Sequence, residues 1–205
     1  MSKRSDTKRW LNKHRNDPYV RAAQQDNYRS RAVYKLAEVD ERDRLLKGKR
    51  CVVDLGAAPG GWSQYCRRQR PEARVVALDR LDMKPIEGVE FLNVDFDQQA
   101  GVDALLATLG SDRVDLVLSD MAPNLTGIMV ADQAGVMQLA ELALDLCNEV
   151  LDSNGDLLIK VFQGEGFDEM LVDMRQRFRR VAVRKPKASR DASREMYLLG
   201  LGWRT

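Results

Sequence analysis

Short apolar segments alternate with longer amphipathic segments through the middle of the chain. Five apolar runs have the length and composition of buried strands, at residues 51–55, 75–79, 89–95, 114–120 and 156–162. Apolar residues recur at helical spacing in the segments between them, at 61–69, 98–109 and 131–151. Strands that alternate with helices predict an α/β fold whose mostly parallel sheet is covered by helices on both faces.

The two ends of the chain add elements of other kinds. We predict further helices at residues 29–46 and 167–177. Residues 179–186 and 195–203 have the pattern of strands, and the short polar loop between them predicts an antiparallel C-terminal pair. Residues 1–28 are polar, basic and weakly periodic, so we predict a basic N-terminal extension in front of one domain at residues 29–205.

The composition favours a soluble cytoplasmic protein without a metal site. No apolar run is long enough to span a bilayer, and the first residues lack the apolar core of a secretory signal. The three cysteines, Cys51, Cys66 and Cys147, are scattered and odd in number, which fits neither a disulfide framework nor a metal centre. The one histidine, His14, lies in a charged stretch, so catalysis by histidine is disfavoured.

The formal net charge of +2 conceals a strong asymmetry along the chain. Residues 1–50 hold 15 basic and seven acidic side chains, and residues 175–205 hold ten and two, so each end carries a net +8. Residues 51–174 hold eight and 22, a net −14. Clustered basic charge is typical of proteins that bind polyanions such as nucleic acid, although solvated charged termini give the same pattern.

A glycine-rich loop, DLGAAPGGW at residues 54–62, follows the first strand and opens a helix. Ligands of open parallel sheets bind at this edge, where glycines let the backbone approach closely. A dinucleotide fingerprint would read G-x-G-x-x-G, but here its second glycine is replaced by Ala58. The loop has no basic residue for a phosphate and begins with Asp54, which suits a cationic ligand such as a sulfonium with an amino group.

Acidic residues stand at the ends of four predicted strands. Asp79 is placed to accept hydrogen bonds from the hydroxyls of an adenosine ribose, and Asp95 is placed close to the adenine. Asp54 and Asp120 complete the series. Each alone is explained equally well as a turn or helix-cap residue, but four in a row favour a nucleoside site.

Lys160 lies inside the apolar run DLLIKVF and is one of two lysines in residues 51–174. A lysine there is costly unless it has a partner or reaches a cleft, or unless it sits on an edge strand with its head group in solvent. If the strands ending at Asp120 and carrying Lys160 are neighbours, both side chains reach one cleft. A sulfonium donates its methyl group by in-line displacement, and a ribose hydroxyl that attacks it must lose its proton, which a lysine can accept.

Six segments in this order resemble the FtsJ/RrmJ (RlmE) family of ribosomal RNA large-subunit methyltransferases. They are RSRAVYKL at 29–36, VDLGAAPGGWSQ at 53–64, ALD at 77–79, SDMAPN at 119–124, LIKVFQG at 158–164 and KPKASRDASREMYL at 185–198. The resemblance implies a Rossmann-like methyltransferase fold that uses S-adenosyl-L-methionine. It also implies transfer to the 2′-oxygen of a uridine in 23S rRNA of the large (50S) ribosomal subunit.

The resemblance assigns roles to individual residues. It implies a catalytic tetrad of Lys35, Asp120, Lys160 and Glu195, in which Lys35 orients the ribose and Glu195 fixes a lysine head group. It places cofactor contacts on Gly60, Trp62, Asp79, Asp95 and Asp120. We expect a monomer.

The basic ends supply candidate RNA contacts. Arg29, Arg31, Arg190 and Arg194 are placed to meet phosphates, and Tyr28 and Tyr34 to stack on an exposed base, with a core role for Tyr34 as an equal alternative. Three other functions remain open: 2′-O-methylation of tRNA or an mRNA cap, a non-catalytic RNA-binding assembly factor, and a nicotinamide-dependent oxidoreductase. The missing glycine disfavours the last, and the intact tetrad disfavours the assembly factor.

Overall fold

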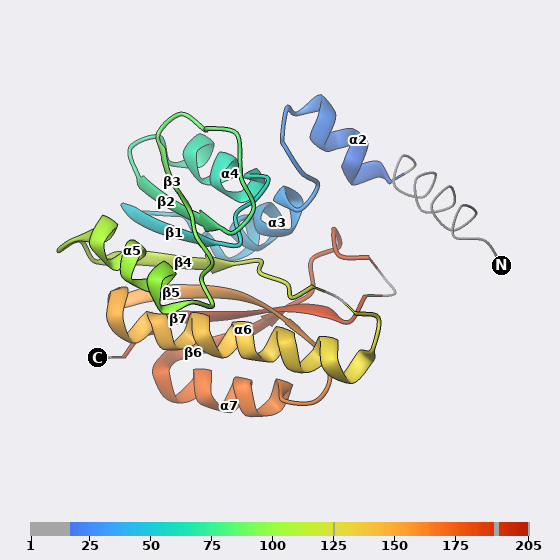
Figure 1. Cartoon of the computed structure of the whole chain (residues 1–205). Coiled ribbons are helices and arrows are strands. Elements are labelled where there is room, and N and C mark those ends of the chain that lie inside the picture. The colour runs from blue at the N-terminus through green and yellow to red at the C-terminus, as the bar shows by residue number, and fades with distance from the viewer. Residues whose placement is uncertain (1–16, 125, 191–192, 205) are drawn as a thin grey trace.

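The computed structural model describes residues 17–124, 126–190 and 193–204 and contains a seven-stranded sheet (Figure 1). The strands are β1 (Cys51–Leu55), β2 (Arg74–Asp79), β3 (Val89–Asn93), β4 (Val114–Ser119), β5 (Leu151–Phe162), β6 (Phe178–Arg184) and β7 (Glu195–Trp203). Their spatial order is β3-β2-β1-β4-β5-β7-β6, and β1 to β5 are parallel. Strand β7 runs antiparallel to both neighbours, which confirms the predicted mixed sheet.

Helices cover both faces of the sheet, as the pattern predicts. One face packs against α5 (Gln99–Leu109), α6 (Met129–Val150) and α7 (Phe167–Arg177). The other face packs against α3 (Val33–Asp43) and α4 (Gly61–Gln69). Alternate residues of each strand enter the two cores, so that Val53 and Leu55 meet one set of helices while Val52 meets the other. The same alternation directs Lys160 toward α3, because its neighbour in phase, Leu158, packs there.

The element boundaries differ from the prediction where the apolar pattern is weak. The predicted helix at 29–46 is confined to α3, which ends where Arg44 adopts a left-handed conformation with φ of 55°. Strand β5 begins at Leu151, five residues early, and its register with β4 shifts between Val114 and Leu116. The polar residues 152–154 interrupt the apolar run, so the pattern could not show that the strand continues through them.

The N-terminal part of the described chain contains an additional helix, α2 (Pro18–Gln25). Asp17 caps it by accepting a hydrogen bond from the Tyr19 backbone N–H at 3.0 Å. The ring centroids of Tyr19 and Tyr34 are 5.6 Å apart, so this helix contacts α3. Residues 1–16 of the predicted extension lie outside the described residues, and the division of the chain at residue 29 stays a prediction.

The described residues contain neither a membrane-spanning helix nor a metal-binding cluster. Within them, no helix is both long and apolar enough to cross a bilayer. No cluster of three or more His, Cys, Asp or Glu side chains suited to a metal ion occurs there either. The three cysteines are buried thiols.

Candidate active site

A cavity of about 410 Å³ opens at the carboxyl edge of the sheet, beside the glycine-rich loop. Its walls come from the ends of β1, β2, β3 and β4 and from the second and third turns of α6. The backbone approach here is close: a Cβ on Gly56 would lie 2.8 Å from the Met121 side chain and 3.0 Å from its Cα. Gly56 also has φ of +74°, so both space and conformation require glycine at this position.

Three of the predicted cofactor residues, Asp79, Asp95 and Asp120, line this cavity. Asp79 holds the loop by accepting hydrogen bonds from Ala58 N at 2.9 Å and Leu81 N at 2.8 Å. Asp95 lies two residues beyond the end of β3, in a turn rather than in the strand. Carboxylates beside apolar walls fit the hydroxyls, amino group and flat base of a nucleoside, and the apolar side chains are those of Val94, Phe96, Met121 and Leu139.

Gly60 and Trp62 do not line the cavity. Gly60 begins α4 with φ of 105° and packs under Met83 and Ile86, where a Cβ would lie within 2.7 Å of both side chains. Trp62 is buried, and its indole Nε1 donates a hydrogen bond to the Ala32 carbonyl at 2.8 Å. Their direct contact with a cofactor stays a prediction.

Asp54 is buried beneath α4 and is not part of the cavity wall. Its Oδ2 accepts a hydrogen bond from Ser63 Oγ at 2.6 Å, whereas its buried Oδ1 has no partner in the structure. Burial raises the pKa of Asp54 to about 7, and the neighbouring charges of Asp120 and Asp79 add to that effect. A cation bound in the cavity would favour the ionised form of this carboxyl group.

We expect Asp54→Asn to stabilise the cofactor-free protein increasingly as the pH rises. The ordinary pKa of the group is 3.8, so above pH 4 the unfolded chain loses a proton that the native state keeps up to about pH 7. Wild-type stability therefore falls across this window relative to the variant, by about 4 kcal/mol in all. Urea unfolding of both proteins at pH 5, 6, 7 and 8 measures the difference, and a gap independent of pH would contradict the assignment.

Lys160 is buried against Asp120 at the end of this edge. Its side chain is only 7% exposed, and its Nζ lies 3.0 Å from Asp120 Oδ1. The same Nζ donates a hydrogen bond to the Asp120 backbone carbonyl at 2.6 Å. Strand β5 lies between β4 and β7, so the alternative of an edge-strand lysine with its head group in solvent is wrong. Asp120 also lines the cavity, so this ion pair adjoins it.

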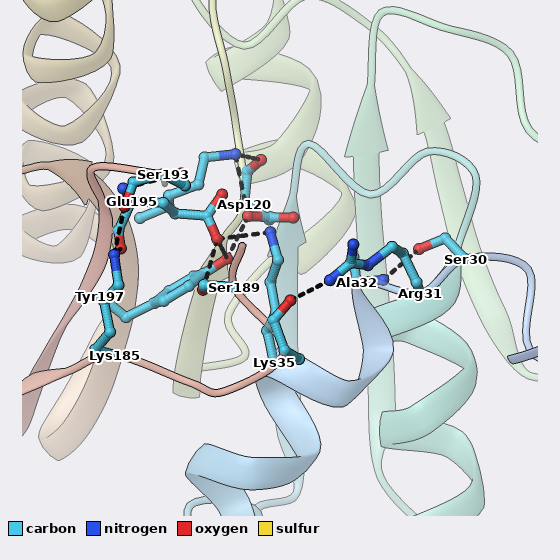
Figure 2. A network of polar contacts seen from close by, with 12 residues as sticks. Ser30, Arg31, Ala32, Lys35, Asp120, Lys185, Ser189, Ser193, Glu195 and Tyr197 are labelled. Atoms are coloured by element: carbon cyan, nitrogen blue, oxygen red, sulfur yellow. Dashed lines mark hydrogen bonds and ion pairs between the residues drawn. The ribbon is translucent and has the colours of Figure 1, made fainter. Parts of the chain in front are cut away.

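The structure brings the four residues of the predicted tetrad together. Figure 2 labels three of them, Lys35, Asp120 and Glu195. Lys35 Nζ, from the first turn of α3, lies 2.7 Å from Glu195 Oε1. The Tyr197 hydroxyl joins the two ion pairs, because it donates to Asp120 Oδ1 at 2.7 Å and lies 3.5 Å from Glu195 Oε1 (Figure 2). The result is one connected polar network at the carboxyl edge of β4 and β5.

Strand register explains how distant segments meet here. Lys160 on β5 is paired with Tyr197 on β7, and Phe162 is paired with Glu195. Paired residues point to the same side, so Lys160 and Tyr197 share the face covered by α3. Ser119 is in register with Ile159, which places Asp120 next to Lys160.

The network fixes the protonation states of the Asp120 carboxyl group and the Tyr197 hydroxyl. Burial by itself favours a raised pKa for Asp120, but the positive charges of Lys160 and Lys35 hold that pKa below its ordinary value. Burial, together with the charges of Asp120 and Glu195, raises the pKa of Tyr197 well above its ordinary value. Asp120 is therefore a carboxylate and Tyr197 a neutral hydroxyl donor at neutral pH.

Sequence reasoning missed two members of the network, Tyr197 and Ser189. Tyr197 lies within the strand segment EMYLLGLGW, where an aromatic residue indicates an ordinary core position. Ser189 donates from Oγ to Glu195 Oε1 at 2.9 Å and comes from a polar loop with no distinguishing pattern. Only the register between β5 and β7 could have revealed Tyr197, because that register places it opposite Lys160.

The candidate RNA contacts have different surroundings. The Arg29 guanidinium donates to the carbonyls of Pro59 at 3.2 Å and Pro85 at 2.7 Å. Arg31 pairs with Asp17 and donates to the Ala188 carbonyl. These contacts give both groups structural partners, and their role in RNA binding stays a prediction.

The remaining candidate RNA contacts differ in how far they are buried. Tyr34 and Tyr28 are partly buried against the α3 core, and the Tyr34 hydroxyl lies 2.5 Å from Asp26 Oδ2. Arg190 is exposed and lines a cavity of about 250 Å³ together with Lys35 and Glu195. Arg31 lines the same cavity, so two of the proposed contacts, Arg31 and Arg190, adjoin the Lys35–Glu195 pair.

Comparison with known proteins gives a consistent result. A family model described as FtsJ-like methyltransferase matches residues 28–203. "Ribosomal RNA large subunit methyltransferase E" of Stenotrophomonas maltophilia is 56% identical over 206 residues, covering 100% of this chain and 98% of that protein. The protein of the same name from Marinobacter nauticus is 51% identical, covering 100% and 99%. A solved structure described as a ribosomal RNA methyltransferase of Plasmodium falciparum is 26% identical, with a TM-score of 0.76 over 86% of this chain and 98% of that one.

The Rossmann-like sheet and these matches define the molecule as a methyltransferase. More particularly, the chain belongs to the FtsJ-like methyltransferase family, as its sequence motifs predict.

Proposed function

We propose that this enzyme transfers a methyl group from S-adenosyl-L-methionine to the ribose 2′-hydroxyl of a uridine in 23S rRNA. The observation that carries the proposal is the buried Lys160–Asp120 pair, whose carboxylate also lines the nucleoside-sized cavity. A proton acceptor next to a methyl-donor site is what an alkyl transfer to a weakly acidic hydroxyl requires.

The residues of the cavity fit the proposed cofactor. When bound, S-adenosyl-L-methionine supplies a methyl group made electrophilic by its sulfonium. We assign Asp79 to the ribose hydroxyls of the cofactor and Asp95 to the neighbourhood of its adenine. The acidic wall suits the positive charges, and the unpartnered Oδ1 of Asp54 lies behind it.

Asp79→Ala is expected to weaken cofactor binding by about 10- to 100-fold, because hydrogen bonds to a charged group contribute about 1.5–3 kcal/mol. The variant also removes the acceptor for Ala58 N, which loosens the loop. Calorimetry with S-adenosyl-L-methionine measures the change. Asp82→Ala, an exposed carboxylate outside the cavity, is the matched control. Unchanged affinity in Asp79→Ala would remove Asp79 from the site.

Lys160 acts as the base in the proposed mechanism. Its Nζ would accept the 2′-hydroxyl proton as that hydroxyl oxygen takes the methyl group that the bound cofactor would supply. The resulting ammonium faces Asp120 Oδ1 and the Asp120 carbonyl, which stabilise it. Tyr197 fixes the Asp120 carboxylate through its hydrogen bond.

Lys35 and Glu195 form the second pair of the network. Glu195 holds the Lys35 head group at 2.7 Å, beside a cavity that Arg190 also lines. We assign Lys35 to orienting the target ribose through its hydroxyl oxygens. Each of the two lysines thus has its own carboxylate, so neither is left buried without a partner.

The substrate assignment rests on the named relatives and on charge. Both basic ends of the chain supply the sign needed for RNA, and the relatives are named for ribosomal RNA of the large subunit. We therefore propose the 50S subunit as the physiological partner, a monomeric enzyme, and the cytoplasm as its location.

Labelled-methyl transfer tests which RNA is the substrate. Four substrates are incubated in parallel with the enzyme and the labelled cofactor. They are large ribosomal subunits purified from cells lacking the protein, deproteinised 23S rRNA, total tRNA and capped mRNA. We expect label on the large-subunit RNA. Transfer to tRNA or to the cap would replace the proposed substrate, and tight RNA binding without any transfer would favour a non-catalytic assembly factor.

A further inference from the structure

Three consecutive large apolar side chains stand exposed where α6 begins. Ile128 is 65% exposed, Met129 63% and Val130 71%. The other exposed large apolar side chains of the described residues occur singly and far apart in sequence, at Leu81, Val172 and Val183. A contiguous exposed apolar group of this kind marks an interaction site, and we call residues 128–130 the apolar platform.

Hydrogen bonds hold the platform in place. Asp132 accepts from Thr126 N at 2.6 Å, from Thr126 Oγ1 at 2.9 Å and from Gly127 N at 3.1 Å. The Ile128 N–H donates to Thr126 Oγ1 at 3.1 Å. The turn that precedes the helix is thereby ordered in the free protein, so a partner does not have to order it on binding.

The platform stands at the rim of the catalytic edge. Further along the same helix, Gly135, Gln138 and Leu139 line the nucleoside cavity. Gln133 Nε2 donates to the carbonyls of Phe162 at 3.0 Å and Glu165 at 2.7 Å, which anchors this part of α6 to the end of the strand that carries Lys160. Figure 1 shows the start of α6 on the same side of the molecule as the loop that leads into β7.

Arg194 lies near Asp132, the residue that holds the turn in front of the platform. The Arg194 guanidinium lies 5.8 Å from the centroid of the Phe162 ring. The carbonyl of the same Phe162 accepts the hydrogen bond from Gln133. The Arg194 charge is also close enough to contribute to the lowered pKa of Asp132, after the hydrogen bonds from Thr126 and Gly127. An apolar surface next to an arginine and a ribose-modifying site matches a nucleotide, whose base is flat and apolar and whose phosphate is anionic.

We propose that the apolar platform packs against the face of an unpaired nucleobase next to the target uridine and holds the RNA strand open at the active site. The inference rests on the proposed rRNA substrate. Proteins use Ile, Leu and Met side chains as wedges between bases, and sequence-specific RNA recognition targets unstacked bases in loops. Three side chains are far fewer than the 20–30 residues that each partner contributes to a stable protein interface, which argues against a second copy as the occupant.

Kinetics with a serine variant test the proposal. Replacing all three residues in I128S/M129S/V130S is expected to raise KM for large ribosomal subunits and Kd for their RNA about tenfold, equivalent to ~1.4 kcal/mol. The kcat and the cofactor affinity are expected to stay within twofold of wild type. Val172→Ser, on α7, is the matched control for loss of an exposed apolar side chain. The variant I128L/M129L/V130L keeps the apolar surface and is expected to restore both KM and Kd.

A crosslinking arm identifies what lies on the platform. A benzophenone amino acid at position 129 is expected to crosslink to RNA of the bound subunit, near the methylated nucleotide. Crosslinks to ribosomal protein or to a second copy of the enzyme would overturn the proposal, as would unchanged KM and Kd in a folded serine variant. Failure of the wild-type enzyme to methylate any rRNA would instead reject the proposed function. The two failures are distinguishable, because the Kd comparison for RNA is measured without methyl transfer.

Discussion

Lys160→Ala is expected to lower kcat for methyl transfer at least about a thousandfold, within the range of about 10²–10⁴ for loss of a general base. The 2′-hydroxyl would keep its proton as it attacks, and the described residues place no other basic nitrogen on Asp120. Because Lys160 does not line the nucleoside cavity, the cofactor Kd is expected to stay within about twofold. Single-turnover transfer and calorimetry measure the two effects.

Two further variants make the Lys160 result specific. Lys160→Arg keeps the positive charge and the pairing with Asp120, yet a guanidinium does not lose a proton at physiological pH, so we expect it to be as inactive as the alanine variant. Lys84→Ala removes the only other lysine side chain in residues 51–174 and is expected to be fully active. An active arginine variant would show that Lys160 acts through its charge rather than as a base.

Asp120→Asn is expected to reduce kcat by about 10²–10³, the usual loss when one preorganised electrostatic partner is removed. The asparagine fills the same space and can still accept from Tyr197, but it no longer stabilises the ammonium that forms on Lys160. Cofactor affinity is expected to fall as well, since Asp120 lines the cavity. The same transfer and calorimetry assays report both changes.

Combining the two substitutions tests whether the residues act as one unit. If Asp120 works through Lys160, the double variant is expected to be no slower than Lys160→Ala alone, because residues of one catalytic unit are not additive. If the loss of kcat in the double variant instead equals the product of the losses in the two single variants, Asp120 contributes to the chemistry independently of the lysine. In that case its main role would lie with the cofactor.

The sequence alone predicted most of the fold because the apolar pattern is strong where the sheet is buried. The runs at 51–55 and 75–79 are apolar on both faces and became β1 and β2 within one residue. The pattern failed at residues 152–154, because polar residues there continue β5 across a register shift that only the neighbouring strand reveals. Asp95 was placed at a strand end and lies in the following turn.

The site was predictable in parts, for reasons that differ from residue to residue. Lys160 and Asp120 could be paired from the sequence, because a lysine in an apolar strand needs a partner and neighbouring parallel strands end together. Lys35 and Glu195 are 160 positions apart and lie on a helix and an antiparallel strand, so only the family resemblance joined them. Tyr197 was missed because the partner of its hydroxyl, Asp120, lies on another strand and cannot be predicted from the segment around Tyr197.

Nucleoside analysis of the product tests whether the methyl group goes to a ribose oxygen. Large ribosomal subunits from cells lacking the protein are methylated with labelled cofactor, and their RNA is digested to nucleosides and separated by mass spectrometry. We expect the label in 2′-O-methyluridine with the wild-type enzyme and not with Lys160→Ala. Label on the uracil ring, or on the ribose with the Lys160→Ala enzyme at the wild-type rate, would contradict this expectation.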